Sequence, residues 1–171
     1  MRLHALAASL VLAGAMACAT ALAQTILEKS ERDEVTRMSD EEPAMARAFE
    51  RARRTLDHFL RLHRSPPPDT RGYAVKVGIS EGANTEYFWI TPFSVDGERF
   101  RGRLSNEPRL VTHVRNGQEI AFGRSDIVDW MYVDVARRRM HGNFTACALL
   151  SREPPEDAAR FRARFGLQCD P

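Results

Sequence analysis

The segment YAVKVGI, residues 73–79, alternates large hydrophobic side chains with small or charged ones. A period of two places successive side chains on opposite faces of a strand, so this segment predicts a strand with one buried face. After a turn at residues 81–84 comes EYFWI, residues 86–90, whose aromatic density is typical of a central strand. The two segments predict an antiparallel sheet at the centre of the fold.

Further strand and turn signals follow this pair. Asp96-Gly97 predicts a hairpin, because this dipeptide adopts the positive φ angles of a tight turn. More strands are expected at residues 100–104, 118–122 and 127–133, after which an arginine-rich bend leads into Met140 and His141. The sheet is therefore expected to have about five to six strands.

The residues before the sheet predict an amphipathic helix. Ser39 and Glu42 have the spacing of a capping box, and Pro43 fits a first helical turn. Hydrophobic residues then recur every three or four positions: Met45, Ala48, Phe49, Ala52, Leu56, Phe59 and Leu60. This stripe predicts a helix packed on one side, which ends before the prolines at 66–68.

A second helix is predicted near the C-terminus. Prolines at 154–155 fit its first turn, Gly166 fits its end, and Ala158, Phe161 and Phe165 form the expected inward stripe. A helix, an antiparallel sheet and a helix in this order predict the α+β class.

The first 23 residues have the pattern of an export signal. Eighteen of them are hydrophobic, Arg2 is basic, and small residues precede Gln24. We expect a signal peptide over residues 1–23 with cleavage between Ala23 and Gln24, and a bacterial protein that is periplasmic or secreted. An uncleaved membrane anchor and a lipoprotein attached through Cys18 are the alternatives.

The predicted mature chain has two parts. Residues 24–38 are rich in charge and predict a flexible leader, and residues 39–171 predict a single domain. No later segment has the roughly 18 consecutive hydrophobic residues that a membrane span needs, so none is expected after cleavage.

Export affects how the remaining cysteines are interpreted. Thiols in an oxidising compartment tend to pair, so we expect a disulfide between Cys147 and Cys169, closing a loop of about 23 residues. The alternative is a buried free Cys147 and an unpaired Cys169.

Residues suited to catalysis are few. The chain has no GxSxG, HExxH, GxxxxGK[ST] or GxGxxG motif, and neither a cofactor nor a metal site is expected. Asp129 and His141 form one candidate pair, with Lys76 and Glu86 in support, and Lys76 is expected opposite Glu86 on the neighbouring strand. Under the alternative interpretation Asp126 turns the chain into a strand and Asp129 accepts structural hydrogen bonds.

The arginines offer a second candidate surface. The net charge of +2 argues against a nucleic-acid partner. Arg99, Arg101 and Arg103 alternate along one expected strand, and a further run lies at 137–139. These arginines predict a solvated face or, as the alternative, a patch for an anionic partner.

Exposed aromatic side chains are common anchors in binding surfaces. The binding candidates are Tyr87, Trp89, Trp130, Tyr132, Asn143 and Phe144. Because side chains alternate along strands, about half of the aromatic ones must point inward. A core position is the stronger expectation for Trp89 and Trp130.

Four short blocks suggest a known family. VKV at 75–77, EYFW at 86–89, DWMY at 129–132 and GNFT at 142–145 resemble the YegJ-like family of bacterial domains, also called domain of unknown function 2314. The resemblance covers residues 73–150 and implies a compact domain that contains a sheet. It implies no reaction, cofactor or catalytic residue.

Two function hypotheses follow. The leading one is a non-enzymatic periplasmic domain that binds a protein or peptide, such as an inhibitor or an immunity-type factor. The competing one is an uncharacterised envelope hydrolase-like enzyme that uses Asp129 and His141.

Overall fold

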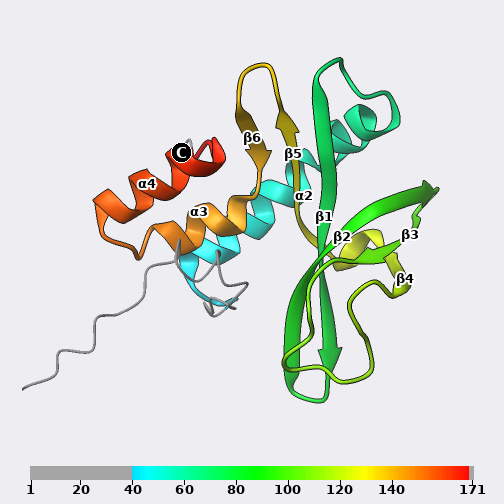
Figure 1. The fold of residues 1–171 in the computed structure, drawn as a ribbon. Coiled ribbons are helices and arrows are strands. Elements are labelled where there is room, and N and C mark those ends of the chain that lie inside the picture. Colours follow the sequence, from blue (N-terminus) through cyan, green and yellow to red (C-terminus); the bar gives the residue numbers. More distant parts are fainter. Residues whose placement is uncertain (1–39, 170–171) are drawn as a thin grey trace, which may run out of the picture.

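The computed structural model describes residues 40–169, which form one antiparallel sheet and three α-helices (Figure 1). The elements are α2 (Pro43–Arg64), β1 (Thr70–Glu81), β2 (Asn84–Asp96), β3 (Arg99–Leu104), β4 (Glu119–Gly123), a 3-10 turn η1 (Arg124–Asp126), β5 (Ile127–Asp134), β6 (Arg139–Gly142), α3 (Phe144–Leu150) and α4 (Pro155–Phe165). The α+β class and the sheet are confirmed. The predicted signal peptide, Cys18 and the leader at 24–38 lie outside the described residues.

The strand order is β4-β3-β2-β1-β5-β6, so β1 lies inside the sheet between β2 and β5. A tight turn places Glu81 opposite Asn84 and thereby fixes the register of the first hairpin. Lys76 consequently lies opposite Trp89, whereas Glu86 lies opposite Ile79. The predicted pairing of Lys76 with Glu86 was wrong, because the two-residue turn sets the partners three positions further along β2.

The second hairpin is also present. Asp96 pairs with Arg99, and Gly97, with φ 61°, is the first of the two turn residues. The turn is therefore centred one residue later than the Asp-Gly pair suggested.

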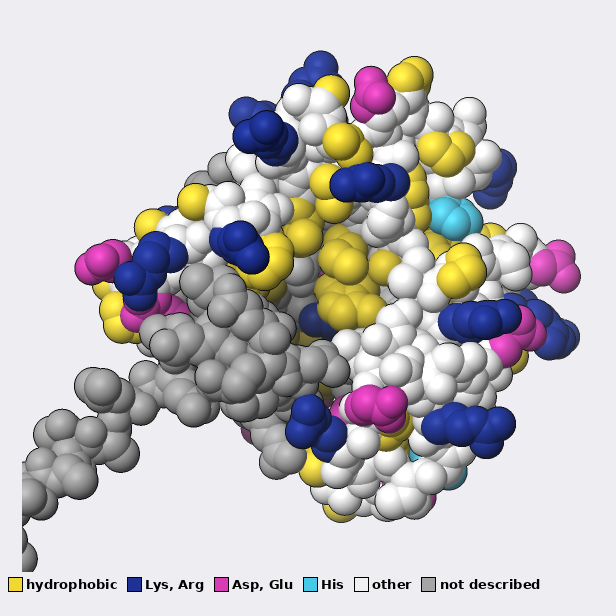
Figure 2. Space-filling model, viewed as in Figure 1, with side chains coloured by type: hydrophobic (Ala, Val, Ile, Leu, Met, Phe, Trp, Pro, Cys, Tyr) yellow, Lys and Arg dark blue, Asp and Glu magenta, His cyan; other side chains and the backbone are white. Residues whose placement is uncertain are grey.

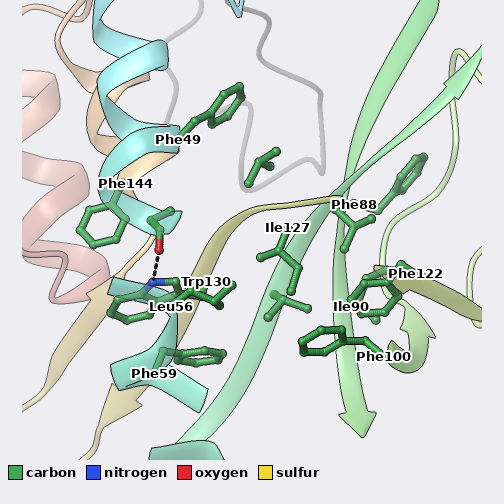
Figure 3. Packing of buried hydrophobic residues seen from close by; sticks show 14 of the residues in the cluster. Phe49, Leu56, Phe59, Phe88, Ile90, Phe100, Phe122, Ile127, Trp130 and Phe144 are labelled. Atoms are coloured by element: carbon green, nitrogen blue, oxygen red, sulfur yellow. Dashed lines mark hydrogen bonds between the residues drawn. The ribbon is translucent and has the colours of Figure 1, made fainter. Parts of the chain in front are cut away.

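Helix α2 packs its hydrophobic stripe against the sheet, and every residue of the predicted stripe is buried. Figure 3 shows Leu56 and Phe59 of this helix facing Trp130. The Trp130 ring stacks on Phe59 at 5.0 Å, and its indole N–H donates to the carbonyl oxygen of Ala52. The core position expected for Trp130 is confirmed.

The start of α2 differs from the prediction. The helix begins at Pro43 with Glu42 at the N-cap, and no side chain caps it. The capping box expected from Ser39 is therefore not the start of the helix, and Ser39 itself lies outside the described residues.

The C-terminal part contains two helices where one was predicted. Helix α3 was missed, and α4 matches the prediction and ends at Gly166 in the left-handed conformation. Phe165 is 37% exposed, so its expected inward position was wrong. The predicted disulfide between Cys147 and Cys169 is present and ties the segment after α4 to α3. No helix in residues 40–169 is long and apolar enough to cross a membrane.

Candidate functional site

Three polar side chains from separate elements meet on the sheet face that points away from α2. Lys76 on β1 lies opposite Asp129 on β5, and Thr145 comes from the first turn of α3. The Lys76 ammonium donates to Thr145 Oγ1 at 2.6 Å, and this hydroxyl donates to Asp129 Oδ2 at 2.7 Å. We call this arrangement the Lys76–Thr145–Asp129 chain.

Asp129 is fully buried and its carboxylate has several further donors. Oδ1 accepts from the backbone N–H groups of Trp130 at 2.8 Å and Phe144 at 3.2 Å, and Oδ2 accepts from the N–H of Thr145 at 2.8 Å. The polypeptide can turn tightly between β6 and α3 because Gly142 has φ 76°. A Cβ at this position would lie 2.0 Å from the carbonyl oxygen of Trp130. Asp129 therefore fastens the start of α3 to β5.

Burial is the largest influence on both charged groups. It raises the pKa of the Asp129 carboxyl, although Lys76 and the hydrogen bonds from Thr145 and Trp130 act in the opposite direction. It lowers the pKa of the Lys76 ammonium, although Asp129 acts in the opposite direction. Each charge depends on the other, because removal of one would leave an uncompensated charge in the interior.

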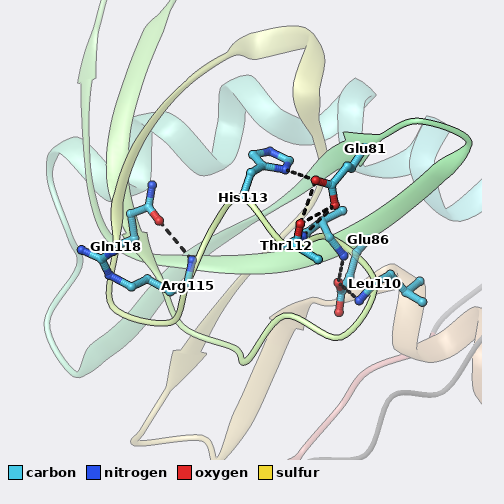
Figure 4. Close-up of polar contacts among 8 residues, drawn as sticks. Glu81, Glu86, Leu110, Thr112, His113, Arg115 and Gln118 are labelled. Atoms are coloured by element: carbon cyan, nitrogen blue, oxygen red, sulfur yellow. Dashed lines mark hydrogen bonds and ion pairs between the residues drawn. The ribbon is translucent and has the colours of Figure 1, made fainter.

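Glu86 lies on the core side of β2 and holds a loop. Its carboxylate accepts hydrogen bonds from the N–H groups of Arg109, Leu110 and Val111, at distances from 2.8 to 3.2 Å (Figure 4). Nearby, Glu81 accepts from both the N–H and the hydroxyl of Thr112. These two carboxylates anchor the loop between β3 and β4.

His141 lies apart from Asp129. It is the cross-strand partner of Tyr132, and the two rings stack at 4.7 Å. Tyr132 is three residues from Asp129 on the same strand, so alternation places Asp129 and His141 on opposite faces of the sheet. Burial lowers the pKa of His141, whereas the charge of Asp134 raises it.

The structure thus joins only two of the four candidate catalytic residues. Lys76 and Asp129 are in one chain, while Glu86 and His141 belong to other clusters. Thr145, which connects the pair, was missed. It lies outside the expected strands, and the register between β1 and β5 together with the start of α3 brings it beside Lys76.

The binding candidates are distributed between the core and the surface. Trp130 and Phe144 are buried, whereas Tyr132 and Asn143 are half-buried near β6. Tyr87 and Trp89 are half-buried on the face opposite Phe88, so Trp89 is more exposed than expected. The Lys76 ammonium lies 4.5 Å from the centre of the Trp89 ring, in cation–π geometry.

Two further features limit the possible chemistry. Within residues 40–169, no three His, Cys, Asp or Glu side chains are grouped so that they could hold a metal ion. An open hollow of about 540 Å³ lies elsewhere, lined by Arg53, Leu56, Glu98, Gly123, Arg124 and Ser125. None of these residues is a catalytic or binding candidate from the sequence.

Comparison with known proteins places the chain in a family. The family model described as "Uncharacterized protein conserved in bacteria (DUF2314)" matches residues 42–169. The chain belongs to this DUF2314 family. The match extends beyond residues 73–150 at both ends, so it includes α2, α4 and both disulfide cysteines.

Two relatives show the range of DUF2314 proteins. The "Uncharacterized protein YegJ" of Escherichia coli (strain K12) is 36% identical over 122 residues, which are 71% of this chain and 77% of the relative. A "Putative ankyrin repeat protein NMB1133/NMB1171" of Neisseria meningitidis serogroup B (strain ATCC BAA-335 / MC58) is 32% identical over 129 residues, and the match covers only half of its length. No solved structure matches the chain.

Proposed function

We propose that this DUF2314 protein is an exported, non-enzymatic domain that binds a protein or peptide with the outer face of β1 and β2. The observation that carries the proposal is the pair of Trp89 and Lys76. Both are half-buried, and the ammonium lies over the indole ring on the face opposite α2. Figure 2 shows hydrophobic side chains gathered in a hollow near the middle of this face.

Tryptophan and tyrosine are effective anchors because each combines a large apolar area with a polar group. Tyr87 lies two residues from Trp89 along β2, where its ring packs 5.5 Å from that of Phe49 on α2 and its hydroxyl donates to Asp40. The backbone N–H of Trp89 is held by the side-chain oxygen of Asn106 at 2.9 Å. The anchor residues are therefore fixed in place before a partner binds, which lowers the entropic cost of association.

A binding role also fits the state of the carboxylates. Asp129 and Glu86 are buried and their oxygens already accept several hydrogen bonds, so neither offers a free acid or base to a substrate. The alternative of a hydrolase-like enzyme using Asp129 and His141 has no support from this geometry, since these residues lie on opposite faces.

The place of action rests on the sequence. A signal peptide at residues 1–23 would be cleaved between Ala23 and Gln24. The mature protein, with a leader at residues 24–38 and a single domain at residues 39–171, would then reach the periplasm or the outside of the cell. Lipidation at Cys18 is the minor alternative. One relative is named as a putative ankyrin repeat protein, and such repeats form extended binding surfaces. That name supports a protein partner for this domain, which would then act as an inhibitor or an immunity-type factor.

Site-specific photo-crosslinking in living cells tests the proposal. The photoreactive residue p-benzoylphenylalanine would replace Trp89 and, as the control, the exposed Ala121 on β4. We expect one recurring envelope protein or peptide to be joined at position 89, not at position 121, and to be displaced by excess unmodified protein. Equal adducts at both positions, or none at position 89, would contradict the proposal. N-terminal sequencing of the fractionated protein, with Gln24 expected first, tests export separately.

A further inference from the structure

The turn between β5 and β6 and the end of α4 are distant in the sequence but lie side by side in the structure. The Met140 N–H donates to the carbonyl oxygen of Gly166 at 2.9 Å, and Met140 also forms a parallel bridge with Leu167. A Cβ on Gly166 would lie 2.1 Å from the carbonyl oxygen of Arg138. The turn between β5 and β6 and the end of α4 are therefore in direct backbone contact.

Both segments carry exposed arginines: Arg137, Arg138 and Arg139 come from the turn, and Arg162 and Arg164 come from α4. Arg137 pairs with Asp134. Within residues 40–169, the other four form no ion pair. Figure 2 shows basic side chains over the β5–β6 hairpin and α4, and acidic side chains lie among those of α4.

The same two segments carry exposed hydrophobic side chains. Val135 is 40% exposed and Phe165 is 37% exposed, and they are the two exposed large hydrophobic residues of the described part of the chain. Val135 begins the turn, where the Arg138 N–H donates to its carbonyl oxygen, and Phe165 directly precedes Gly166. Each basic segment therefore carries one exposed apolar side chain.

Arginines around exposed apolar side chains fit a membrane surface with anionic lipids, because the cations attract the headgroups while the apolar groups enter the interface. The row of Arg99, Arg101 and Arg103 on β3 lacks this combination. Asp96 and Glu119 lie opposite its outer members, and its exposed neighbours include no large hydrophobic residue. That row matches a solvated strand face.

We propose that the surface formed by Val135, Arg138, Arg139, Arg162, Arg164 and Phe165, which we call the basic end, binds peripherally to membranes that contain anionic lipids. The disulfide between Cys147 and Cys169 holds the segment after α4 against α3 and so keeps the α4 half of the basic end in place. Membrane binding consequently depends on the oxidised protein.

Vesicle co-sedimentation tests the basic end directly. The purified, disulfide-bonded protein would be mixed with vesicles of phosphatidylcholine alone or of phosphatidylcholine with phosphatidylglycerol, at low and high salt. We expect binding only to the anionic vesicles and its loss at high salt, because salt screens the headgroup charge. Equal binding to both vesicle types would overturn the proposal.

Two triple variants provide a matched comparison. Replacement of Arg138, Arg162 and Arg164 by glutamine removes three charges from the basic end, and the same change at Arg99, Arg101 and Arg103 removes three from β3. Each arginine near an anionic surface contributes about fivefold in affinity, so the first variant should bind on the order of a hundredfold more weakly. The β3 variant should bind like the unmodified protein, and an equal loss in both variants would refute a localised site.

A further change separates lipid from an acidic protein as the ligand. Phe165→Ser should weaken binding to anionic vesicles several-fold at every salt concentration, because an apolar anchor is lost. Reduction of the disulfide should weaken binding as well. If Phe165→Ser has no effect and soluble polyglutamate binds as tightly as the vesicles do, the basic end recognises acidic polypeptides and the membrane proposal fails. Circular dichroism of every variant verifies the fold.

Discussion

Replacement of Asp129 by asparagine tests whether this carboxylate is structural. Asparagine has the same shape, but one oxygen becomes an NH2 group. Because each oxygen of Asp129 accepts two hydrogen bonds, either orientation of the amide directs a donor at the N–H groups of Trp130, Phe144 or Thr145. Lys76 also loses its counter-charge. Unsatisfied buried donors and a half-buried cation without its counter-charge together should cost about 3–5 kcal/mol of unfolding free energy.

Urea denaturation measures this loss, and Asp126→Asn is the matched control. Asp126 is exposed and accepts one hydrogen bond, from the N–H of Gly123, so its replacement should cost less than about 1 kcal/mol. A domain of this size has a total stability of about 5–15 kcal/mol, so the two outcomes are easily separated. If Asp129→Asn lowers stability by no more than the control, the carboxylate does not fasten α3, and a chemical role for the Lys76–Thr145–Asp129 chain returns.

Three other perturbations have defined outcomes. Burial lowers the pKa of His63, so the unfolded chain binds more protons than the folded one. The free energy of unfolding therefore falls as the pH drops through the pKa of the unfolded histidine, about 6.5. His63→Phe should reduce this dependence of stability on pH, measured by urea titrations at several pH values. Glu86→Gln should cost about 2 kcal/mol and accelerate hydrogen exchange at the amides of residues 109–111. Replacement of Cys147 and Cys169 by serine should lower the unfolding free energy by about 3 kcal/mol in urea, as expected for partners 22 residues apart.

Each of the three variants has a result that would contradict its prediction. An unchanged pH slope in His63→Phe would assign the pH dependence to other groups. Uniform exchange across the protein in Glu86→Gln would mean that the carboxylate supports the whole fold and not the loop alone. A serine variant as stable as the parent under oxidising conditions would show that α3 and the C-terminal segment need no covalent link.

The sheet and α2 were predictable because their environments are one-sided. A strand or helix with one face in the core and one in water shows a period of two or of 3.6 in its sequence. The buried stripe of α2 agrees with the prediction residue by residue. Strand register was harder, because it depends on which residues occupy a turn, and a shift of the turn moves every cross-strand partner.

Helix α3 could not be recognised by the same argument. Phe144 and Ala148 belong to the main core, while Ala146 and Leu150 pack in a second cluster with Phe161 of α4. The helix is therefore apolar on both sides, so its sequence has no amphipathic period. It is also only seven residues long, and its start depends on the left-handed conformations of Gly142 and Asn143, which periodicity does not report.

The blocks DWMY and GNFT, through which the family was recognised, are joined to each other in the structure. Asp129 accepts from the N–H groups of Phe144 and Thr145, the N–H of Asn143 donates to the carbonyl oxygen of Trp130, and Gly142 fits where a Cβ would collide with that oxygen. These residue types are therefore required to connect β5 to α3, whatever the protein binds. Because that connection accounts for the blocks physically, the family resemblance reports the fold. Function has to be sought in side chains that the fold leaves accessible, such as Trp89 and the arginines of the basic end.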